Sequence, residues 1–186
     1  QHALMNYNKA DISGGTFKIS DDAKAVIINA KYDDVMDQGI LNITNGSFFG
    51  AKVLTSNVDV KISGGLFSED LSRFVIDSCK SYETDNGYVV APKTTDITIH
   101  LEKQKIKVQE TTKLIVDSRN PTNTLDEMKY TSSDDSIATI DSNGQITGLK
   151  AGTVTLTVAS GEIQKSVDLT VYEIKDTKID TSKRMD

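Results

Sequence analysis

The sequence predicts an almost entirely β-structured chain made of two modules, and three observations carry this prediction. Val, Ile and Thr make up 52 of the 186 residues, whereas Pro occurs twice and Trp is absent; β-branched residues favour strands. A glycine-phenylalanine motif recurs in the first half, and apolar and polar residues alternate in the second. The apolar content of 37% is enough for two modest cores and argues against disorder.

The first module is predicted from a repeat. Residues 12–17, 43–48 and 62–67 each follow the pattern I-(S/T)-(G/N)-G-x-F, and the second Gly position recurs after 31 and then 19 residues. In each copy an apolar residue ends a short strand, glycine permits backbone angles that a Cβ resists, and Phe returns to the core. Further apolar runs, each about one strand long, lie at Ala25–Ile28, Gly39–Ile43, Val58–Ile62 and Phe74–Ile76. This spacing predicts a short right-handed parallel β-helix of roughly four coils over residues 1–92.

An alternative interpretation is a small antiparallel domain in which the Gly-x-Phe segments are hairpin turns. A β-helix requires parallel strands and stacked Phe17, Phe48 and Phe67, whereas a meander does not. The motifs resemble the Gly-Gly-x-Phe coils of surface proteins from gut-dwelling Gram-positive bacteria, and the resemblance covers residues 10–91. In that type the last motif is followed by a short acidic helical segment and a closing strand, which residues 67–72 and 85–90 match.

The second module is predicted from alternation. Pro92–Asp96 has the composition of a linker, and Pro92 lacks the amide that a continuing sheet would use, so the boundary is placed there. Beyond it, apolar residues occupy every second position of several short segments. The clearest are Ile97, Ile99 and Leu101, then Val154, Leu156 and Val158, then Val167, Leu169 and Val171. About seven strands in eighty residues predict a β-sandwich.

Residues 96–172 resemble a group 2 bacterial immunoglobulin-like domain, the module repeated in intimin and invasin stalks. The agreement rests on Ser132-Ser133-Asp134, Ala138-Thr139-Ile140-Asp141, Asn143-Gly144 and Gly148-Leu149-Lys150-Ala151-Gly152-Thr153 in that order. Tyr130 stands where the family usually has Trp, and it can fill the same core space. We therefore expect an immunoglobulin-like β-sandwich over residues 93–173, followed by a linker or tail over residues 174–186.

No catalytic or cofactor-binding residues are predicted. His2 and His100 lie in separate halves, and Cys79 is the single cysteine, so neither a Cys/His pair nor a disulfide is indicated. The densest acidic group is Asp33, Asp34 and Asp37, with Asp21 and Asp22 upstream. Some parallel β-helices set such acids in a catalytic groove, but no basic cluster accompanies them here. A solvated loop is the simpler interpretation.

No metal site is predicted either. Asp33, Asp34 and Asp37, and separately Asp134, Asp135 and Asp141, could supply oxygen ligands, but neither set follows a known calcium-loop spacing. Asp134 has a simpler role, since its carboxylate can accept backbone amides in a turn. A structural calcium ion is left open.

Charge and hydropathy exclude two classes of partner. The net charge is −6, and residues 1–92 carry 8 basic against 12 acidic side chains, the remainder 13 against 15. Neither half therefore offers a basic surface for nucleic acid. No apolar run reaches the length of about 20 residues that spans a bilayer, so membrane insertion is not expected. Tyr7, Tyr32, Tyr82 and Tyr88 could stack on sugar rings, although none is assigned to a ligand.

These observations predict a non-enzymatic fragment of a large bacterial cell-surface or secreted protein that acts as a structural stalk or adhesion module. Its expected partners are host or environmental glycans or proteins and neighbouring domains of the same chain. The alternative is a carbohydrate-binding or carbohydrate-active accessory region of an extracellular glycan-degrading protein. A phage or tail-fibre module would share both folds. Because the chain starts at Gln1, we expect it to be a piece of a longer, secreted precursor.

Overall fold

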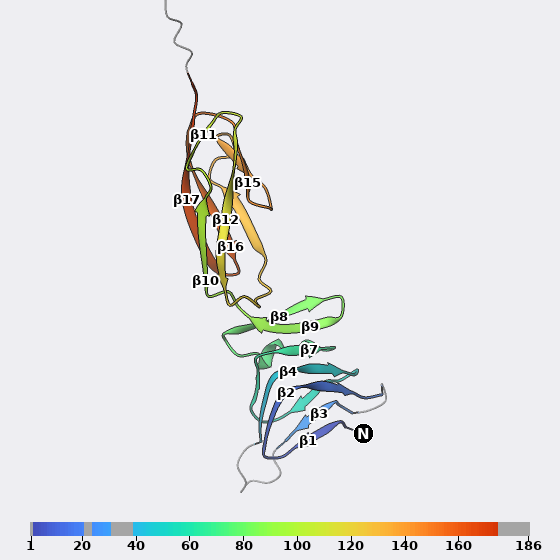
Figure 1. Cartoon of the computed structure of the whole chain (residues 1–186). Coiled ribbons are helices and arrows are strands. Elements are labelled where there is room, and N and C mark those ends of the chain that lie inside the picture. Colours follow the sequence, from blue (N-terminus) through green and yellow to red (C-terminus); the bar gives the residue numbers. More distant parts are fainter. Residues whose placement is uncertain (1, 21–23, 31–38, 175–186) are drawn as a thin grey trace, which may run out of the picture. The chain divides into compact units, whose positions relative to one another are not determined.

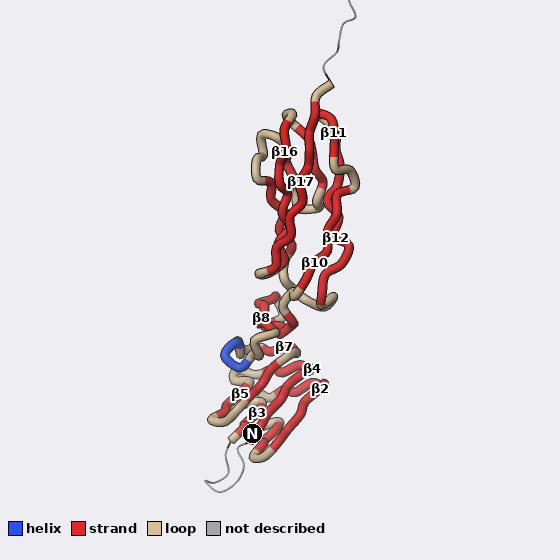
Figure 2. Tube along the Cα trace, turned by 90° about the vertical axis from the view of Figure 1, so that its left-hand side faces the viewer, coloured by secondary structure: helices blue, strands red, loops and turns tan. Residues whose placement is uncertain are grey.

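The computed structural model describes residues 2–20, 24–30 and 39–174, which consist of strands, turns and one 3-10 turn (Figure 1). The all-β prediction is therefore confirmed for the described residues, and Figure 2 shows the strands in red throughout both units. Contacts divide the chain into two compact units that part between Lys93 and Thr94, with residues 121–125 counted in the first.

The first unit contains nine strands and the 3-10 turn among the described residues. They are β1 (Leu4–Asn6), β2 (Lys9–Lys18), β3 (Ile27–Asn29), β4 (Ile40–Phe49), β5 (Leu54–Ser56), β6 (Val60–Ile62), β7 (Gly65–Phe67), η1 (Ser72–Phe74), β8 (Cys79–Thr84) and β9 (Gly87–Pro92).

Most strands of the first unit pair in parallel. One sheet has the order β1-β3-β5, and in the other β2 pairs with β4, which pairs with both β6 and β7. The register aligns the same position of three successive segments, as in Phe17↔Phe48↔Phe67. We call these segments rung 1 (residues 4–18), rung 2 (residues 27–30 and 39–49) and rung 3 (residues 54–67).

The Phe side chains of the three rungs form a stack. The ring centroids of Phe17 and Phe48 are 4.9 Å apart and those of Phe48 and Phe67 are 5.0 Å apart, with nearly parallel planes. Before each Phe the backbone passes through a Gly with φ between 97° and 128°, a region that side chains with a Cβ avoid. The predicted glycine turns and stacked Phe rings are confirmed, and the Gly-x-Phe segments are not hairpin turns.

The structure does not show the right-handed parallel β-helix of roughly four coils predicted for residues 1–92, because the larger sheet of the unit is mixed. After rung 3, β9 pairs antiparallel with β7, and β8 pairs antiparallel with β9. The two-residue loop Asp85-Asn86, followed by Gly87 at φ 117°, reverses the chain and makes β8 and β9 a hairpin. The expected strand at Phe74–Ile76 is also absent, because η1 occupies its start and only Val75 bridges to Ile62.

The second unit contains eight strands among the described residues. They are β10 (Asp96–Leu101), β11 (Lys105–Lys107), β12 (Thr111–Asn120), β13 (Met128–Ser132), β14 (Ala138–Ile140), β15 (Gln145–Gly148), β16 (Gly152–Ser160) and β17 (Ile163–Tyr172).

The strands of the second unit form two four-stranded sheets, β10-β12-β15-β14 and β11-β17-β16-β13. Apolar residues at alternate positions fill the space between them: Val154, Leu156 and Val158 of β16 are each at most 2% exposed. Tyr130 packs half-buried against this core, and burial raises the pKa of its hydroxyl. The predicted β-sandwich is confirmed. The first strand is split, since β10 belongs to one sheet and β11 to the other.

Candidate functional site

His100 and Cys79, two of the residues considered for catalysis, belong to different units. His100 is exposed, as alternation predicts, and its Nδ1 lies 2.8 Å from Oδ2 of Asp117. An exposed polar contact of this kind contributes little. Cys79 is buried in the other unit, where its Sγ donates a 3.4 Å hydrogen bond to the carbonyl of Ser63.

Only some of the acidic residues considered for metal binding belong to the part of the chain that the structure describes. Asp21, Asp22, Asp33, Asp34 and Asp37 lie outside the described residues. The described residues contain no group of three or more His, Cys, Asp or Glu side chains that could hold a metal ion.

Asp134 stabilises a turn, as predicted. One of its carboxylate oxygens accepts hydrogen bonds from the Ser136 hydroxyl at 2.6 Å and the Ser136 amide at 2.9 Å. These bonds lower the pKa of the Asp134 carboxyl, the hydroxyl contributing most. Asp141 accepts the amides of Asn143 and Gln145, each at 2.8 Å, in the next turn.

The described tyrosines considered for glycan stacking come from different segments: Tyr7 from the bend between β1 and β2, Tyr82 from β8 and Tyr88 from β9. Tyr7 is 39% exposed, whereas Tyr82 and Tyr88 are half-buried. The Lys80 ammonium lies 5.2 Å from the centre of the Tyr82 ring, and Tyr88 pairs with Phe67 in the closing strand β9. Tyr32 lies outside the described residues. No helix in the described ranges is long and apolar enough to cross a membrane.

In the second unit, β11, the second half of the split first strand, pairs with the last strand, β17. β11 pairs with β17 in parallel, with Lys105 opposite Thr170 and Lys107 opposite Tyr172. The amide of Val108 extends this ladder by donating to the Tyr172 carbonyl at 3.0 Å. Since both strands run in the same direction, the chain enters the sandwich at one end and leaves at the other (Figure 1). Tension applied between the two ends would therefore act along this ladder.

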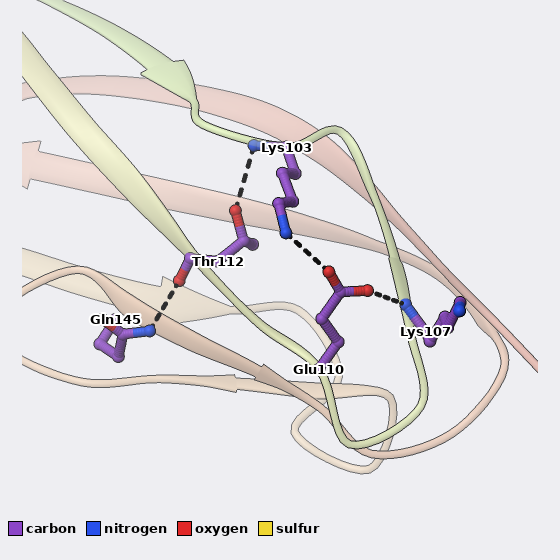
Figure 3. A network of polar contacts seen from close by, with 5 residues as sticks. All are labelled: Lys103, Lys107, Glu110, Thr112 and Gln145. Carbon is purple, nitrogen blue, oxygen red and sulfur yellow. Dashed lines mark hydrogen bonds and ion pairs between the residues drawn. The ribbon is translucent and has the colours of Figure 1, made fainter.

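A polar network fixes the segment that carries β11 (Figure 3). The Glu110 carboxylate accepts a hydrogen bond from the Lys103 ammonium at 2.7 Å and from the Lys107 amide at 2.8 Å. Beside it, the Lys103 amide donates to the Thr112 hydroxyl at 3.1 Å, and the Gln145 side chain donates to the Thr112 carbonyl at 3.1 Å. Five residues from β11, β12, β15 and the connecting segments are thus tied together.

The charges in this network stabilise each other. The hydrogen bond from Lys103 is the main reason that the pKa of Glu110 is lowered, and the Lys107 amide adds to the effect. In return, the hydrogen bond to Glu110 raises the pKa of Lys103. Both groups are fully ionised near neutral pH, and because both are exposed the attraction is screened by water.

A second, buried network fixes the start of the second unit. Oδ2 of Asp126 accepts a hydrogen bond from the Thr94 amide at 2.7 Å, and the Thr94 and Ser160 hydroxyls lie 2.7 Å apart. The Arg119 guanidinium donates to the Asp126 carbonyl at 2.9 Å. Gly161, at φ 59°, leaves room for the carboxylate, since a Cβ there would come within 2.5 Å of it. Sequence reasoning did not identify this network, because its partners are up to 66 residues apart.

The two-sheet sandwich with parallel first and last strands defines an immunoglobulin-like β-sandwich. Residues 93–171 match the family described as "Bacterial Ig-like domain (group 2)". This segment is therefore a bacterial immunoglobulin-like domain, and it makes up less than half of the chain.

Two further similarities were found. The chain is 35% identical over 113 residues to a 3-O-alpha-D-galactosyl-alpha-L-arabinofuranosidase of Bifidobacterium longum subsp. longum, a match that covers 55% of this chain and 10% of the relative. This chain thus spans about a tenth of that relative's length. A crystal structure of an intimin mutant from EHEC O157:H7 aligns with 41% of this chain and 46% of its own, at 19% identity and a TM-score of 0.35. The structural likeness is too partial to carry an argument.

Proposed function

We propose that this chain is a non-enzymatic structural module of a large bacterial cell-surface or secreted protein, in which the immunoglobulin-like domain acts as a spacer. The observation that carries the proposal is the parallel pairing of β11 with β17. A domain with this arrangement passes tension from one neighbour to the next through a sheared ladder. Its expected partners are the neighbouring domains of the same protein and extracellular glycans or proteins.

The two polar networks support this role, because they lie at the start of the domain and beside β11. The buried Asp126 network holds the first residue of the domain, and Glu110 holds the turn after β11. Neither resembles a catalytic arrangement, since each carboxylate is engaged by an amide or ammonium group of the domain itself. We further propose that the three rungs are the last coils of a short parallel β-helix, which the parallel register supports.

Single-molecule force spectroscopy tests the spacer proposal. The whole chain is tethered at its two ends, and the unfolding force of the domain is recorded for the parent and for Val108→Pro. Proline removes the amide that donates to Tyr172, so the mean unfolding force should fall. Val108→Ala, which keeps the amide, controls for the lost side chain.

A second control separates mechanical from thermodynamic stability. Leu156→Ala removes a fully buried side chain of β16 that takes no part in the β11–β17 ladder, and should cost about 2–5 kcal/mol of unfolding free energy. We expect it to lower the melting temperature more than Val108→Pro does, but the unfolding force less. A force that follows melting temperature across all variants would overturn the proposal.

A second candidate function is a glycan-binding accessory region, and the similarity to part of a glycosidase favours it. A glycan array probed with the whole chain tests this candidate, with Tyr7→Ser and Tyr82→Ser as variants. Reproducible binding that is lost in one variant and kept in the other would establish a glycan site and replace the purely structural role.

A further inference from the structure

The two ends of the rung stack in the first unit differ. Beyond rung 3 the stack is closed: β9 pairs with β7, and Val75 bridges to Ile62 of β6. The Glu69 carboxylate accepts the Val53 amide at 2.8 Å, beside the start of β5. At the other end, no strand in the described ranges pairs with the outer edge of β1 or β2. Among the described residues, the outward backbone donors and acceptors of β1 and β2 therefore have no strand partner.

The core side chains of rung 1 are also less buried than those of rungs 2 and 3. The Phe rings of rungs 2 and 3 are 0% exposed, whereas Phe17 of rung 1 is only partly buried. Ile12 is 8% exposed, and its register partners Ile43 and Ile62 are 0% exposed. Rung 1 thus carries core side chains that are covered on one side only.

An amide ladder also stops at rung 1. Asn6, Asn29 and Ser56 occupy one register position. The Asn6 side chain donates to Oδ1 of Asn29 at 2.7 Å, and the Asn29 side chain donates to the Ser56 hydroxyl at 3.2 Å. Oδ1 of Asn6 accepts the Asn8 amide at 3.3 Å, and a carbonyl oxygen has a second lone pair for another donor.

From these observations we infer that the outer edge of β1 and β2 is a docking surface for one further rung of the same repeat, added in parallel register. The partner carries an apolar residue opposite Leu4, Asn opposite Asn6, Ile opposite Ile12 and Phe opposite Phe17. Its Asn donates to Asn6, and its Phe covers the open face of Phe17. This inference concerns the first unit and does not depend on the spacer role of the second.

The test builds that rung onto the chain. A second copy of residues 4–18 replaces residues 1–3 and is joined to Leu4 by Gly-Ala-Lys-Val, the sequence that connects rungs 2 and 3 at residues 50–53. The matched control carries Ile12→Ser and Phe17→Ser within the inserted copy only. Hydrogen exchange of β2 is measured in the parent, the extended chain and the control.

We expect the β2 amides that point away from β4 to exchange freely in the parent and at least about tenfold more slowly in the extended chain, since each gains a hydrogen bond. The control should match the parent.

Three results would overturn the inference. Outward amides of β2 that are already protected in the monomeric parent would mean that the chain covers its own edge. A dimer detected by sedimentation that protects β2 would make a second copy the occupant. An extended chain whose first unit gains no more protection than the control, or unfolds while the control folds, would mean that the edge does not accept a rung.

Discussion

The two units bury their apolar side chains in different ways. In the sandwich, two sheets cover each other, so side chains of the split first strand and of the last strand are as buried as those in the middle: Ile106 and Leu169 are both 0% exposed. In the rung stack, each layer is covered only by its neighbours, so burial depends on position, from the partly buried Phe17 to the fully buried Phe48. The two sheets of a sandwich cover each other's apolar faces, whereas a stack of rungs needs a further segment to cover the rung at each end.

The largest expected effect tests this dependence on position. Phe48→Ala removes a ring that is stacked on both sides and should cost the first unit about 3–5 kcal/mol of unfolding free energy. Phe17→Ala removes a ring stacked on one side and should cost clearly less. Urea unfolding, followed by hydrogen exchange in each unit, measures both variants. Equal losses would contradict the view that rung 1 is an open end.

The next effect concerns a buried polar contact of the sandwich. Asp126→Ala leaves the Thr94 amide without the carboxylate that it bonds at 2.7 Å, and an unsatisfied buried donor costs about 1–3 kcal/mol. Asp117→Ala, which removes the exposed partner of His100, is the matched control and should change stability by less than about 0.5 kcal/mol. Similar losses for both would show that the buried network does not fix the start of the domain.

The sequence predicted those parts of the fold whose signals are local. Alternation along residues 154–158 indicated a half-buried strand, and the repeated Gly-x-Phe indicated stacked turns. The closing hairpin was foreseen only as a strand, because residues 85–87 specify a turn but not that β9 pairs with β7. The partnership of Thr94 with Asp126 left no local signal, since it joins residues 32 positions apart. The apolar run at Phe74–Ile76 wrongly indicated a strand, because contacts with residues distant in sequence, such as Val75 with Ile62, determine its structure.

A smaller effect is expected at the closed end of the stack. Burial alone would raise the pKa of Glu69, but hydrogen bonds from Lys52 and the Val53 amide outweigh it and lower the pKa. A lowered pKa means that the stabilisation is present above the unfolded pKa of about 4.3 and is lost as the pH falls through the folded value. The first unit of the parent should therefore lose stability in acid, and Glu69→Gln should remove that part of the pH dependence. Thermal unfolding measured from pH 7 down to pH 3 tests this, and a difference between parent and variant that does not shrink as the pH falls would contradict the assignment.

The smallest expected effect is at Glu110, which is exposed. Its pKa is lowered and that of Lys103 is raised, so their attraction acts between about pH 4.3 and 10.4 and is lost on either side. At pH 7, Glu110→Gln should slightly lower the melting temperature of the second unit, and added salt should shrink the difference because exposed charges are screened. The hydrogen bond to the Lys107 amide can survive with glutamine as acceptor, so the unfolding force should change less than in Val108→Pro. A loss of force as large as in Val108→Pro would instead make the charged turn, rather than the β11–β17 ladder, the element that resists extension.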